Sequence, residues 1–389
     1  MSSSTGRAPL SGLVVADFSR ILAGPLATQI LADLGAYVIK IERPGQGDDT
    51  RTWGPPFLQG GDAAYYFAVN RNKHSIALDL TDDDDIQTAG RIVARSDVLV
   101  ENFRPNVMSR FGLDYPTLSK EHPRLVYASI PAFAGSTNQD MPGFDLLMQA
   151  RTGFMSFTGG PQGEPAKMGV AMLDVVAGLY ATVAIQAALA QREVTGQGQQ
   201  IRVGLFEASI AALVNQATNY LLGGLVPGPA GTSHPNIVPY QGFRSSDGRF
   251  VLAVGNEKQF QAACDGMGRP DLATDPRYAT NSKRVDHRDD LIAELESIFE
   301  KQTTEHWVAL FDSLGVPAAP MLRLDQVFST PEALATVTEI EDPVRGTLRL
   351  VKSPIQGSDL GDVPLAPPPR LGEHENEIRA WLANEDDET

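Results

Sequence analysis

Cysteine, long apolar runs and positive charge are all scarce in this chain. Cys264 is the single cysteine in 389 residues, which excludes an intrachain disulfide and a thiolate metal cluster and fits a reducing, cytoplasmic setting. The apolar stretch without a charged residue at 175–191 contains polar side chains and falls short of the ~20 apolar residues of a membrane span, so we expect none. Acidic residues outnumber basic ones by 48 to 32, and the net charge of −16 disfavours nucleic acid and anionic lipid as partners.

The sequence also lacks the short motifs of several enzyme classes. The first strand-to-helix turn offers Ala23-Gly24-Pro25 rather than Gly-x-Gly-x-x-Gly, which disfavours a nicotinamide cofactor. A phosphate-binding Gly-x-x-x-x-Gly-Lys-Ser/Thr loop does not occur either. The six histidines are scattered, without the spacing of a metal-binding helix, so we expect no metal site.

Strand-like and helix-like patterns alternate through the first 150 residues. We expect strands at 13–17, 37–41, 75–80, 97–100 and 125–130, with helices at 26–34 and 82–95 between them. Alternation of this kind predicts an α/β fold with a doubly wound, mostly parallel, Rossmann-like sheet.

Composition changes at 223–231, where the run GGLVPGPAG is typical of a linker. We therefore expect a large α/β domain whose N-terminal part is 1–222, and a smaller α+β domain at 232–329. The last segment, 330–389, is expected to return to the large domain.

Asp174 lies between Gly169 and Gly178, at the beginning of a long helical pattern of small and apolar residues. An aspartate before a helix is a good N-cap, because its carboxylate accepts backbone N–H bonds that have no partner inside the helix. A carboxylate flanked by apolar residues also suits a covalent nucleophile or a proton carrier. The local pattern favours the cap, and the two roles do not exclude each other.

Three arginines follow predicted strands closely enough to meet at one edge of the sheet. Arg43, Arg104 and Arg110 would converge on an anionic ligand there, because ligands of parallel sheets bind at the carboxyl ends of the strands. They are equally compatible with a solvated surface paired to local acids such as Glu42. The acidic run 82–85 is interpreted as a solvated helix cap, and the aromatic run 65–67 as core.

The chain resembles the class III CoA-transferases, the family of formyl-CoA transferase and carnitine CoA-transferase. Each matching motif is weak alone, but their order and spacing along nearly the whole chain are specific. The motifs are PLSGLVVADF at 9–18, AGP at 23–25, LGAYVIKIE at 34–42, NRNKHS at 70–75, VENF at 100–103, TGQGQ at 195–199, HPNIVPY at 234–240 and LGEH at 371–374.

The resemblance implies a chemistry for Asp174. The family's Gly-x-x-x-x-Asp-x-x-x-Gly segment carries the nucleophile, and Gly169, Asp174 and Gly178 match it position for position. That role implies CoA transfer from an acyl-CoA, plausibly succinyl-CoA, to a small carboxylic acid through aspartyl anhydride and aspartyl-CoA thioester intermediates. It implies no cofactor beyond coenzyme A itself, and an interlocked homodimer.

The resemblance also implies the surrounding site. Leu22 and Ala23 would line the reacting thioester, although formyl-CoA transferases carry Gln at the position of Leu22. Asp145 matches an acidic position near the nucleophile, on the acceptor side. The CoA adenosine and phosphates would meet Arg43, Leu78, Asp79, Leu80, Thr81, Asn102, Phe103, Arg104 and Arg110.

Two alternatives share the same fold. A 2-methylacyl-CoA racemase of the family would place a histidine proton carrier where this chain has Phe144, which cannot carry a proton. A non-catalytic acyl-CoA-binding protein would be expected to lose the nucleophile, whereas Asp174 is present.

Overall fold

The computed structural model describes residues 7–135, 140–160, 163–361 and 363–384, which form two compact units. The larger unit comprises the described residues up to Phe154, Met168–Leu225 and those from Ala335 onward. The second unit comprises Met155–Lys167 and Val226–Leu334. The composition places 155–167 in the large domain, whereas in the structure this segment belongs to the second unit. Within that unit, Gly159 O accepts the Gly231 N–H at 2.8 Å.

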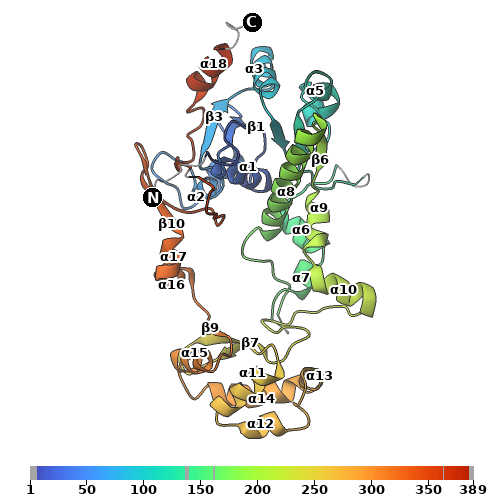
Figure 1. The fold of residues 1–389 in the computed structure, drawn as a ribbon, viewed down its shortest axis with the longest axis vertical. Helices are drawn as coiled ribbons and strands as arrows, with labels where there is room; N and C mark the ends of the chain where they lie inside the picture. The colour runs from blue at the N-terminus through green and yellow to red at the C-terminus, as the bar shows by residue number, and fades with distance from the viewer. Residues whose placement is uncertain (1–6, 136–139, 161–162, 362, 385–389) are drawn as a thin grey trace. The chain divides into compact units, whose positions relative to one another are not determined.

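Six strands form the centre of the larger unit (Figure 1). Their order is β3-β2-β1-β4-β5-β6 and every pairing is parallel, which confirms the expected doubly wound α/β sheet. The strands are β1 Val14–Asp17, β2 Tyr37–Glu42, β3 Lys73–Ala77, β4 Val98–Glu101, β5 Val126–Ser129 and β6 Gln200–Arg202.

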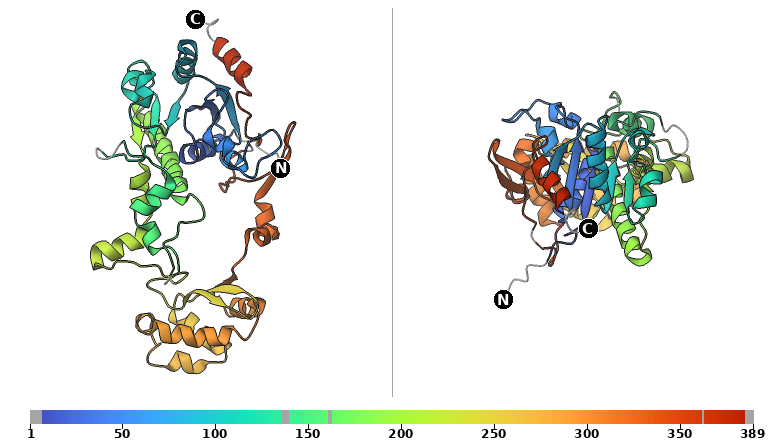
Figure 2. Two further views of the ribbon diagram at one scale, coloured as in Figure 1. Left: turned by 180° about the vertical axis from the view of Figure 1, so that it is seen from behind. Right: turned by 90° about the horizontal axis from the view of Figure 1, so that it is seen from above.

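Helices cover both faces of this sheet (Figures 1 and 2). Because successive strand residues point to opposite faces, Val15 packs with α1 and α8 whereas Ala16 packs with α3 and α18. The helices are α1 Ala23–Asp33, the 3-10 turn η1 Asp49–Thr52, α2 Ala64–Phe67, α3 Asp83–Ala94, α4 Val107–Arg110, α5 Tyr115–Glu121, α6 Asp145–Arg151, α7 Phe154–Phe157, α8 Met172–Thr195, α9 Leu205–Ala211, α10 Val214–Gly223 and α18 Glu375–Ala383.

The helix α8 is apolar over most of its length. Within the described part of the chain it is the one helix long and apolar enough, by length and composition, to cross a membrane. One of its faces carries Leu173, Ala177 and Ile185, which are fully buried in the core cluster that also holds Val15 of the sheet. The core helix of a globular domain has the same composition.

The C-terminal segment covers the edge strand β3. The Asn72 N–H donates to Ala366 O at 3.1 Å, and the Ser75 backbone pairs with His374. In that pair the His374 N–H donates to Ser75 O at 3.0 Å, and the Ser75 N–H donates to His374 Nδ1 at 3.2 Å. A sheet edge that would otherwise expose unpaired backbone groups is thereby closed. The antiparallel hairpin β10 Val337–Asp342 and β11 Gly346–Val351 precedes this segment.

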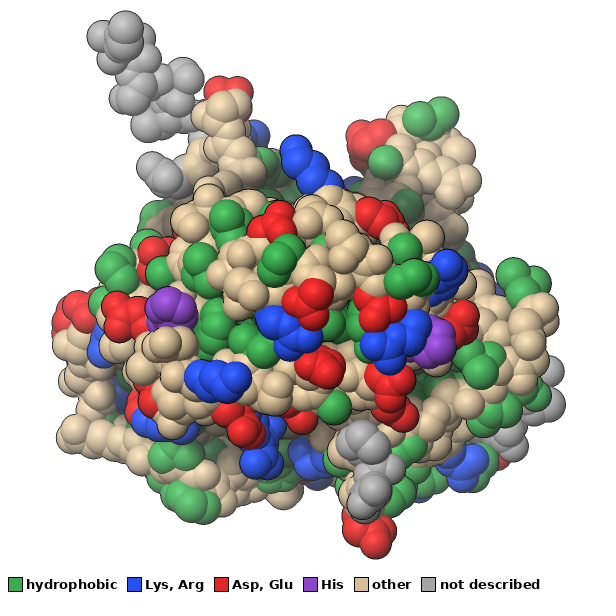
Figure 3. Space-filling model, turned by 90° about the horizontal axis from the view of Figure 1, so that it is seen from below, with side chains coloured by type: hydrophobic (Ala, Val, Ile, Leu, Met, Phe, Trp, Pro, Cys, Tyr) green, Lys and Arg blue, Asp and Glu red, His purple; other side chains and the backbone are tan. Residues whose placement is uncertain are grey.

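The second unit is a three-stranded antiparallel sheet, β7-β8-β9, packed with helices around an aromatic core that includes Phe243, Phe250 and Phe299. On the face drawn in Figure 3, acidic and basic side chains are interspersed. The elements are β7 Tyr240–Arg244, β8 Arg249–Ala253, α11 Glu257–Gly266, α12 Pro270–Thr274, α13 Asn281–Asp286, α14 Arg288–Phe299, α15 Thr304–Ser313 and β9 Ala318–Pro320, followed by α16 Leu324–Val327 and α17 Pro331–Ala335.

Candidate active site

The strand order reverses between β1 and β4, and a cavity lies where the chain leaves these two strands. The helix after β1, α1, packs on one face of the sheet, whereas α4, after β4, packs on the other, so the two loops diverge. The cavity has a volume of about 180 Å³. Its lining includes Ile21, Ala23, Asn102, Phe103, Arg104, Phe144 and Asp174.

Asp174 lies inside the first turn of α8, two residues after the helix begins. The N-cap is Ala171, which makes no side-chain cap bond, so the expectation that Asp174 caps the helix is wrong. The cap-like acceptor comes instead from Asp145, whose Oδ2 accepts the Leu173 N–H at 3.3 Å. A negative charge in the first turn is still favourable for the helix.

Gly178 brings α8 against the beginning of α1. A Cβ atom added at Gly178 would lie 2.6 Å from the carbonyl oxygen of Ala23, which leaves no room for a side chain. Residues four apart lie on the same face of a helix, so Asp174 is one turn along from this contact. The close approach of the two backbones therefore places the carboxylate beside the N-terminus of α1.

Burial raises the pKa of Asp174 to about 7, with a further contribution from the negative charge of Asp145. Asp145 is itself buried, and its Oδ1 accepts a hydrogen bond from Gln149 Nε2 at 2.7 Å. Gln149 is held in turn by the Met168 N–H, which donates to Gln149 Oε1 at 2.8 Å. The pair thus combines a fixed carboxylate with one that titrates near neutral pH.

Tyr65 is close enough to this carboxylate pair for its pKa to respond to their charges, although the sequence pattern places it in the core with its neighbours. Tyr66 and Phe67 are buried as expected, whereas Tyr65 is only half-buried. Its pKa is raised by burial and then by the charges of Asp174 and Asp145. The sequence holds no signal for this difference, because α2 is a single turn whose orientation depends on tertiary packing.

The loop between β1 and α1 contains a left-handed residue. Ile21 has φ 71°, a backbone conformation that costs a β-branched residue about 1–2 kcal/mol. The preceding residue, Arg20, is fixed by Asn102, whose Oδ1 accepts the Arg20 N–H at 2.9 Å and whose Nδ2 donates to Arg20 O at 2.8 Å. The side-chain amide of Asn102, expected on CoA, is therefore occupied by this loop.

The expected basic residues differ in whether they line the cavity. Of the three arginines expected from the sequence, Arg104 lines the cavity, whereas Arg43 and Arg110 lie outside its lining. Arg43 pairs with Asp49 at 2.9 Å, and its buried Nε has no hydrogen-bond partner among the described residues. Arg20, which the sequence reading did not single out, lies over the Phe103 ring, 4.7 Å from its centroid. Its pKa is lowered by burial and by the nearby charge of Arg43.

The remaining expected ligand residues lie at helix and strand ends. Leu22 is the buried N-cap of α1, and Ala23 is the first residue of that helix. Leu78 packs in the core beside β3, with its side chain buried, and Asp79 accepts hydrogen bonds from both the N–H and the hydroxyl of Thr81. The segment Leu78, Asp79, Leu80 and Thr81 follows the carboxyl end of β3 and does not line the cavity.

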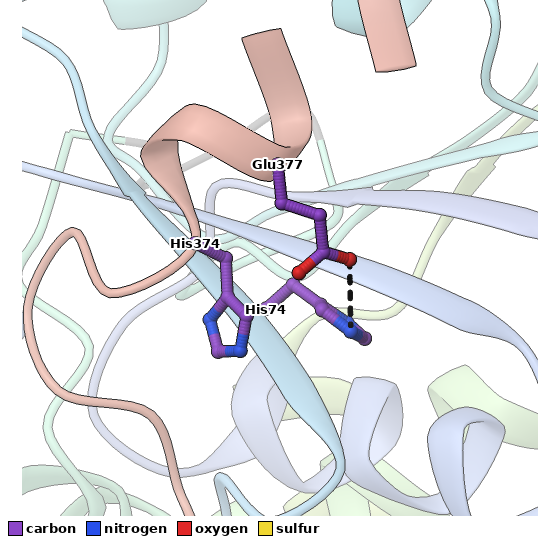
Figure 4. A group of neighbouring side chains, drawn as sticks. All are labelled: His74, His374 and Glu377. Carbon is purple, nitrogen blue, oxygen red and sulfur yellow. Dashed lines mark ion pairs between the residues drawn. The ribbon is translucent and has the colours of Figure 1, made fainter. Parts of the chain in front are cut away.

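A second group of polar side chains lies elsewhere in the larger unit. His74 on β3 and His374 and Glu377 at α18 offer ligand atoms that all lie within 4.8 Å of one another (Figure 4). Because His374 Nδ1 accepts the Ser75 N–H, the neutral imidazole carries its proton on Nε2, which opposes metal binding there. We interpret the group as a fastening of α18 to the sheet. Sequence spacing does not reveal it, since His74 lies some 300 residues before the other two members.

Comparison with known proteins agrees with this architecture. The family model described as CoA-transferase family III matches residues 10–375. Human succinyl-CoA:glutarate CoA-transferase is 40% identical over 383 residues, covering 97% of this chain and 87% of the human protein. Acetyl-CoA:oxalate CoA-transferase of Acetobacter aceti is 39% identical, covering 97% and 96%.

Solved structures share the fold of this chain. A CAIB/BAIF family protein from Brucella suis is 42% identical, with a TM-score of 0.85 and coverage of 96% of this chain and 99% of that chain. Rv3272 from Mycobacterium tuberculosis is 31% identical, with a TM-score of 0.84 and coverage of 96% and 99%. The chain belongs to CoA-transferase family III and is an enzyme of that type.

Proposed function

We propose that this enzyme moves CoA from succinyl-CoA to a small dicarboxylic acid, with Asp174 as the covalent nucleophile. The observation that carries the proposal is a carboxylate with a pKa of about 7 on the wall of a cavity at the sheet's reversal point. Several of the named relatives use succinyl-CoA with glutarate, mesaconate or citramalate, which are dicarboxylic acids. Asp145 lies beside the nucleophile on the proposed acceptor side.

The proposed reaction proceeds in four balanced steps. A carboxylate oxygen of Asp174 attacks the thioester carbonyl, the C–S bond breaks, and CoA leaves as a thiolate from a mixed anhydride. The thiolate attacks the aspartyl carbonyl and releases the donor acid, leaving an aspartyl-CoA thioester. The acceptor carboxylate then attacks this thioester, the C–S bond breaks, and CoA thiolate leaves a second mixed anhydride between Asp174 and the acceptor. The thiolate attacks the acceptor acyl carbonyl of this anhydride, which gives the acceptor's CoA ester and releases the Asp174 carboxylate.

The N-terminus of α1 is proposed to stabilise the oxyanion of these steps. The first N–H groups of a helix have no acceptor within it, and Ala23 and Gly24 supply two of them beside Asp174. Leu22 and Ala23 would then line the thioester. Such donors are aimed at charge that develops in the transition state, so they favour reaction over ground-state binding.

The CoA nucleotide is proposed to bind outside the cavity along the carboxyl ends of the strands. Cations for its phosphates are Arg43, Arg104 and Arg110, and the Phe103 ring offers a surface for the adenine. The segment 78–81 completes this proposed surface, whereas Asn102 supports it by holding the backbone of Arg20. The chemistry requires no cofactor beyond coenzyme A.

The transferase is preferred over a racemase of the same family. A racemase requires proton carriers on both faces of the α-carbon, and Phe144 lines the cavity at the position where the second carrier belongs. The cavity wall is thus apolar at that point.

We further propose that the enzyme is an interlocked homodimer in a reducing, cytoplasmic setting. Apolar side chains on α8 and α10 are exposed in the single chain, including Val183 at 66% and Leu222 at 88%. Apolar surface of this kind is typical of a protein interface. Light scattering is expected to give twice the chain mass of 41.8 kDa, and a monomer mass would contradict the proposal.

Transfer is expected to increase with pH through about 7, because the carboxylate form of Asp174 is the nucleophile. Asp145→Asn removes the neighbouring negative charge, lowers the pKa of Asp174 and moves this rise to lower pH. The measurement is the pH dependence of kcat/KM for both proteins. A rise at the same pH in both would show that Asp174 does not govern it.

Incubation with succinyl-CoA and one dicarboxylic acid at a time tests the proposed function directly. The expected result is formation of the acceptor's CoA ester with equimolar release of succinate, both measured by liquid chromatography. Hydrolysis alone, or exchange of the α-proton in deuterated water without transfer, would contradict it.

A further inference from the structure

Buried side chains fix the backbone of the loop that joins β1 to α1. The Ser19 N–H donates to Asp17 Oδ1 at 3.0 Å, and Ser19 O accepts Lys40 Nζ at 2.9 Å. Asp17 ends β1 and Lys40 lies within β2, so two neighbouring strands of the sheet hold this one residue. Backbone groups of a loop are ordinarily satisfied by water, whereas here charged groups with no solvent exposure satisfy them.

Side chains also satisfy the backbone groups of the next two residues. Both backbone groups of Arg20 bond to Asn102, as described above. The Ile21 N–H donates to the carboxylate of Asp48, at 3.3 Å from Oδ1 and 3.2 Å from Oδ2. The left-handed conformation of Ile21 therefore coincides with a bond to a buried negative charge.

Asp48 and Lys40 form a buried ion pair beneath the loop. Their side chains are 0% and 1% exposed, and Lys40 Nζ lies 2.9 Å from Asp48 Oδ2. Burial alone would raise the pKa of Asp48, but the Lys40 ammonium and hydrogen bonds from Thr50 hold it at about 2. The carboxylate is thus ionised, and remains an acceptor, throughout the pH range in which the enzyme works.

The loop transmits its position to the helix. A Cβ atom on Gly24, the second residue of α1, would collide with the Ser19 side chain, so the loop packs directly on the first turn of the helix. Ile21 and Ala23 both line the cavity that holds Asp174. A shift of Ser19 or Ile21 would therefore displace the first N–H groups of α1 relative to the carboxylate.

We propose that the buried Lys40–Asp48 pair positions the β1–α1 loop, holding Ile21 in its left-handed conformation so that the first turn of α1 meets the thioester at Asp174. The inference rests on the proposed function for its kinetic consequence. Lys40 and Asp48 contact the loop and not the cavity, so they are positioning residues rather than catalytic ones.

Asp48→Asn and Lys40→Met test the pair. The asparagine amide turns two N–H donors toward donors at Lys40 and Ile21, and the methionine leaves Asp48 without its cation. A small misplacement of reacting groups is expected to reduce kcat about 10- to 100-fold. The KM for succinyl-CoA should change little, because the proposed phosphate contacts remain.

Asp342→Asn is the matched control. Asp342 is also buried, is paired with an arginine, and accepts the N–H groups of Val344 and Arg345 in the turn between β10 and β11. Its replacement should reduce thermal stability with little effect on kcat. An equal loss of kcat in Asp48→Asn and Asp342→Asn would overturn the proposal, since the effect would then be general destabilisation.

The Ile21→Gly variant provides a second, independent test of the proposal. Glycine adopts positive φ without a steric cost, so the loop depends less on Asp48 when residue 21 is glycine. The fold-loss in kcat caused by Asp48→Asn should therefore be smaller in the Ile21→Gly background than in wild type. An equal or larger loss would contradict a role in holding Ile21.

Hydrogen exchange separates this inference from the proposed function. Amides of 19–23 should exchange faster in Asp48→Asn than in wild type or Asp342→Asn, whether or not CoA transfer is detected. Unchanged exchange in that segment overturns the positioning role. Absence of transfer in the wild type, with faster exchange in Asp48→Asn, would remove the proposed function and leave Asp48 as the support of the loop.

Discussion

Replacing Asp174 by asparagine is expected to abolish CoA transfer while succinyl-CoA still binds. The amide nearly matches the carboxylate in shape but cannot form the anhydride, so turnover should decrease by at least about 1000-fold. Binding should change little, because the proposed contacts with the CoA phosphates come from arginines on other elements. Transfer assays and calorimetry of succinyl-CoA binding measure the two effects separately.

Asp290→Asn is a suitable control, because Asp290 is also the third residue of its helix, α14, and lies in the second unit. It should retain wild-type turnover. Intact-protein mass spectrometry after mixing with succinyl-CoA and then borohydride should give a modification that peptide mapping places at Asp174. Turnover in Asp174→Asn, or an adduct at another residue, would remove Asp174 from its role.

Gly178→Ala is expected to impair both stability and catalysis. The added methyl group would lie 2.6 Å from Ala23 O, so α8 must move away from the beginning of α1. Overpacking of this kind reduces the free energy of unfolding by about 1–3 kcal/mol. Because Asp174 lies one turn away on the same helix, kcat should decrease together with stability.

Gly90→Ala in α3 is the matched control, because a Cβ atom there meets nothing within 4 Å. Alanine in a helix interior should increase the free energy of unfolding by about 0.5–1 kcal/mol, without an effect on turnover. Urea denaturation and steady-state kinetics of both variants provide the comparison. Unaltered stability and kcat in Gly178→Ala would mean that the contact between α1 and α8 tolerates a side chain.

The sequence predicts those parts of the fold that carry strong periodic patterns. The five strands expected in the first 130 residues are present, with bounds that differ by a few residues at most. The acidic run 82–85 forms the expected helix cap, in which the Asp82 side chain accepts the N–H groups of Asp84 and Asp85. Strand β6, only three residues long and mostly polar, was not expected because such a segment has no pattern of its own.

The candidate site was predicted less completely, for a physical reason. Asp174 and Arg104 belong to recognisable motifs, and the structure brings both to the cavity. The sequence did not single out Tyr65, Arg20 or Ile21 for the site. Their exposure and conformation depend on residues that are distant in the sequence, and no local spacing encodes those contacts. The exposure of Tyr65 depends on how a single helical turn packs, and the conformation of Ile21 depends on a carboxylate 27 positions away.

The covering of β3 by residues 366–374 has a consequence for biosynthesis. This strand lies at the edge of a sheet whose other strands are all complete by Arg202, yet its outer side stays unpaired until residues 366–374 have been synthesised. Contacts between residues so distant in sequence slow folding, and an open strand edge invites pairing with other chains. A ribosome stalled before residue 366 would therefore hold a nascent chain whose central sheet is assembled but has an open edge at β3. Protection by chaperones matters most for that chain.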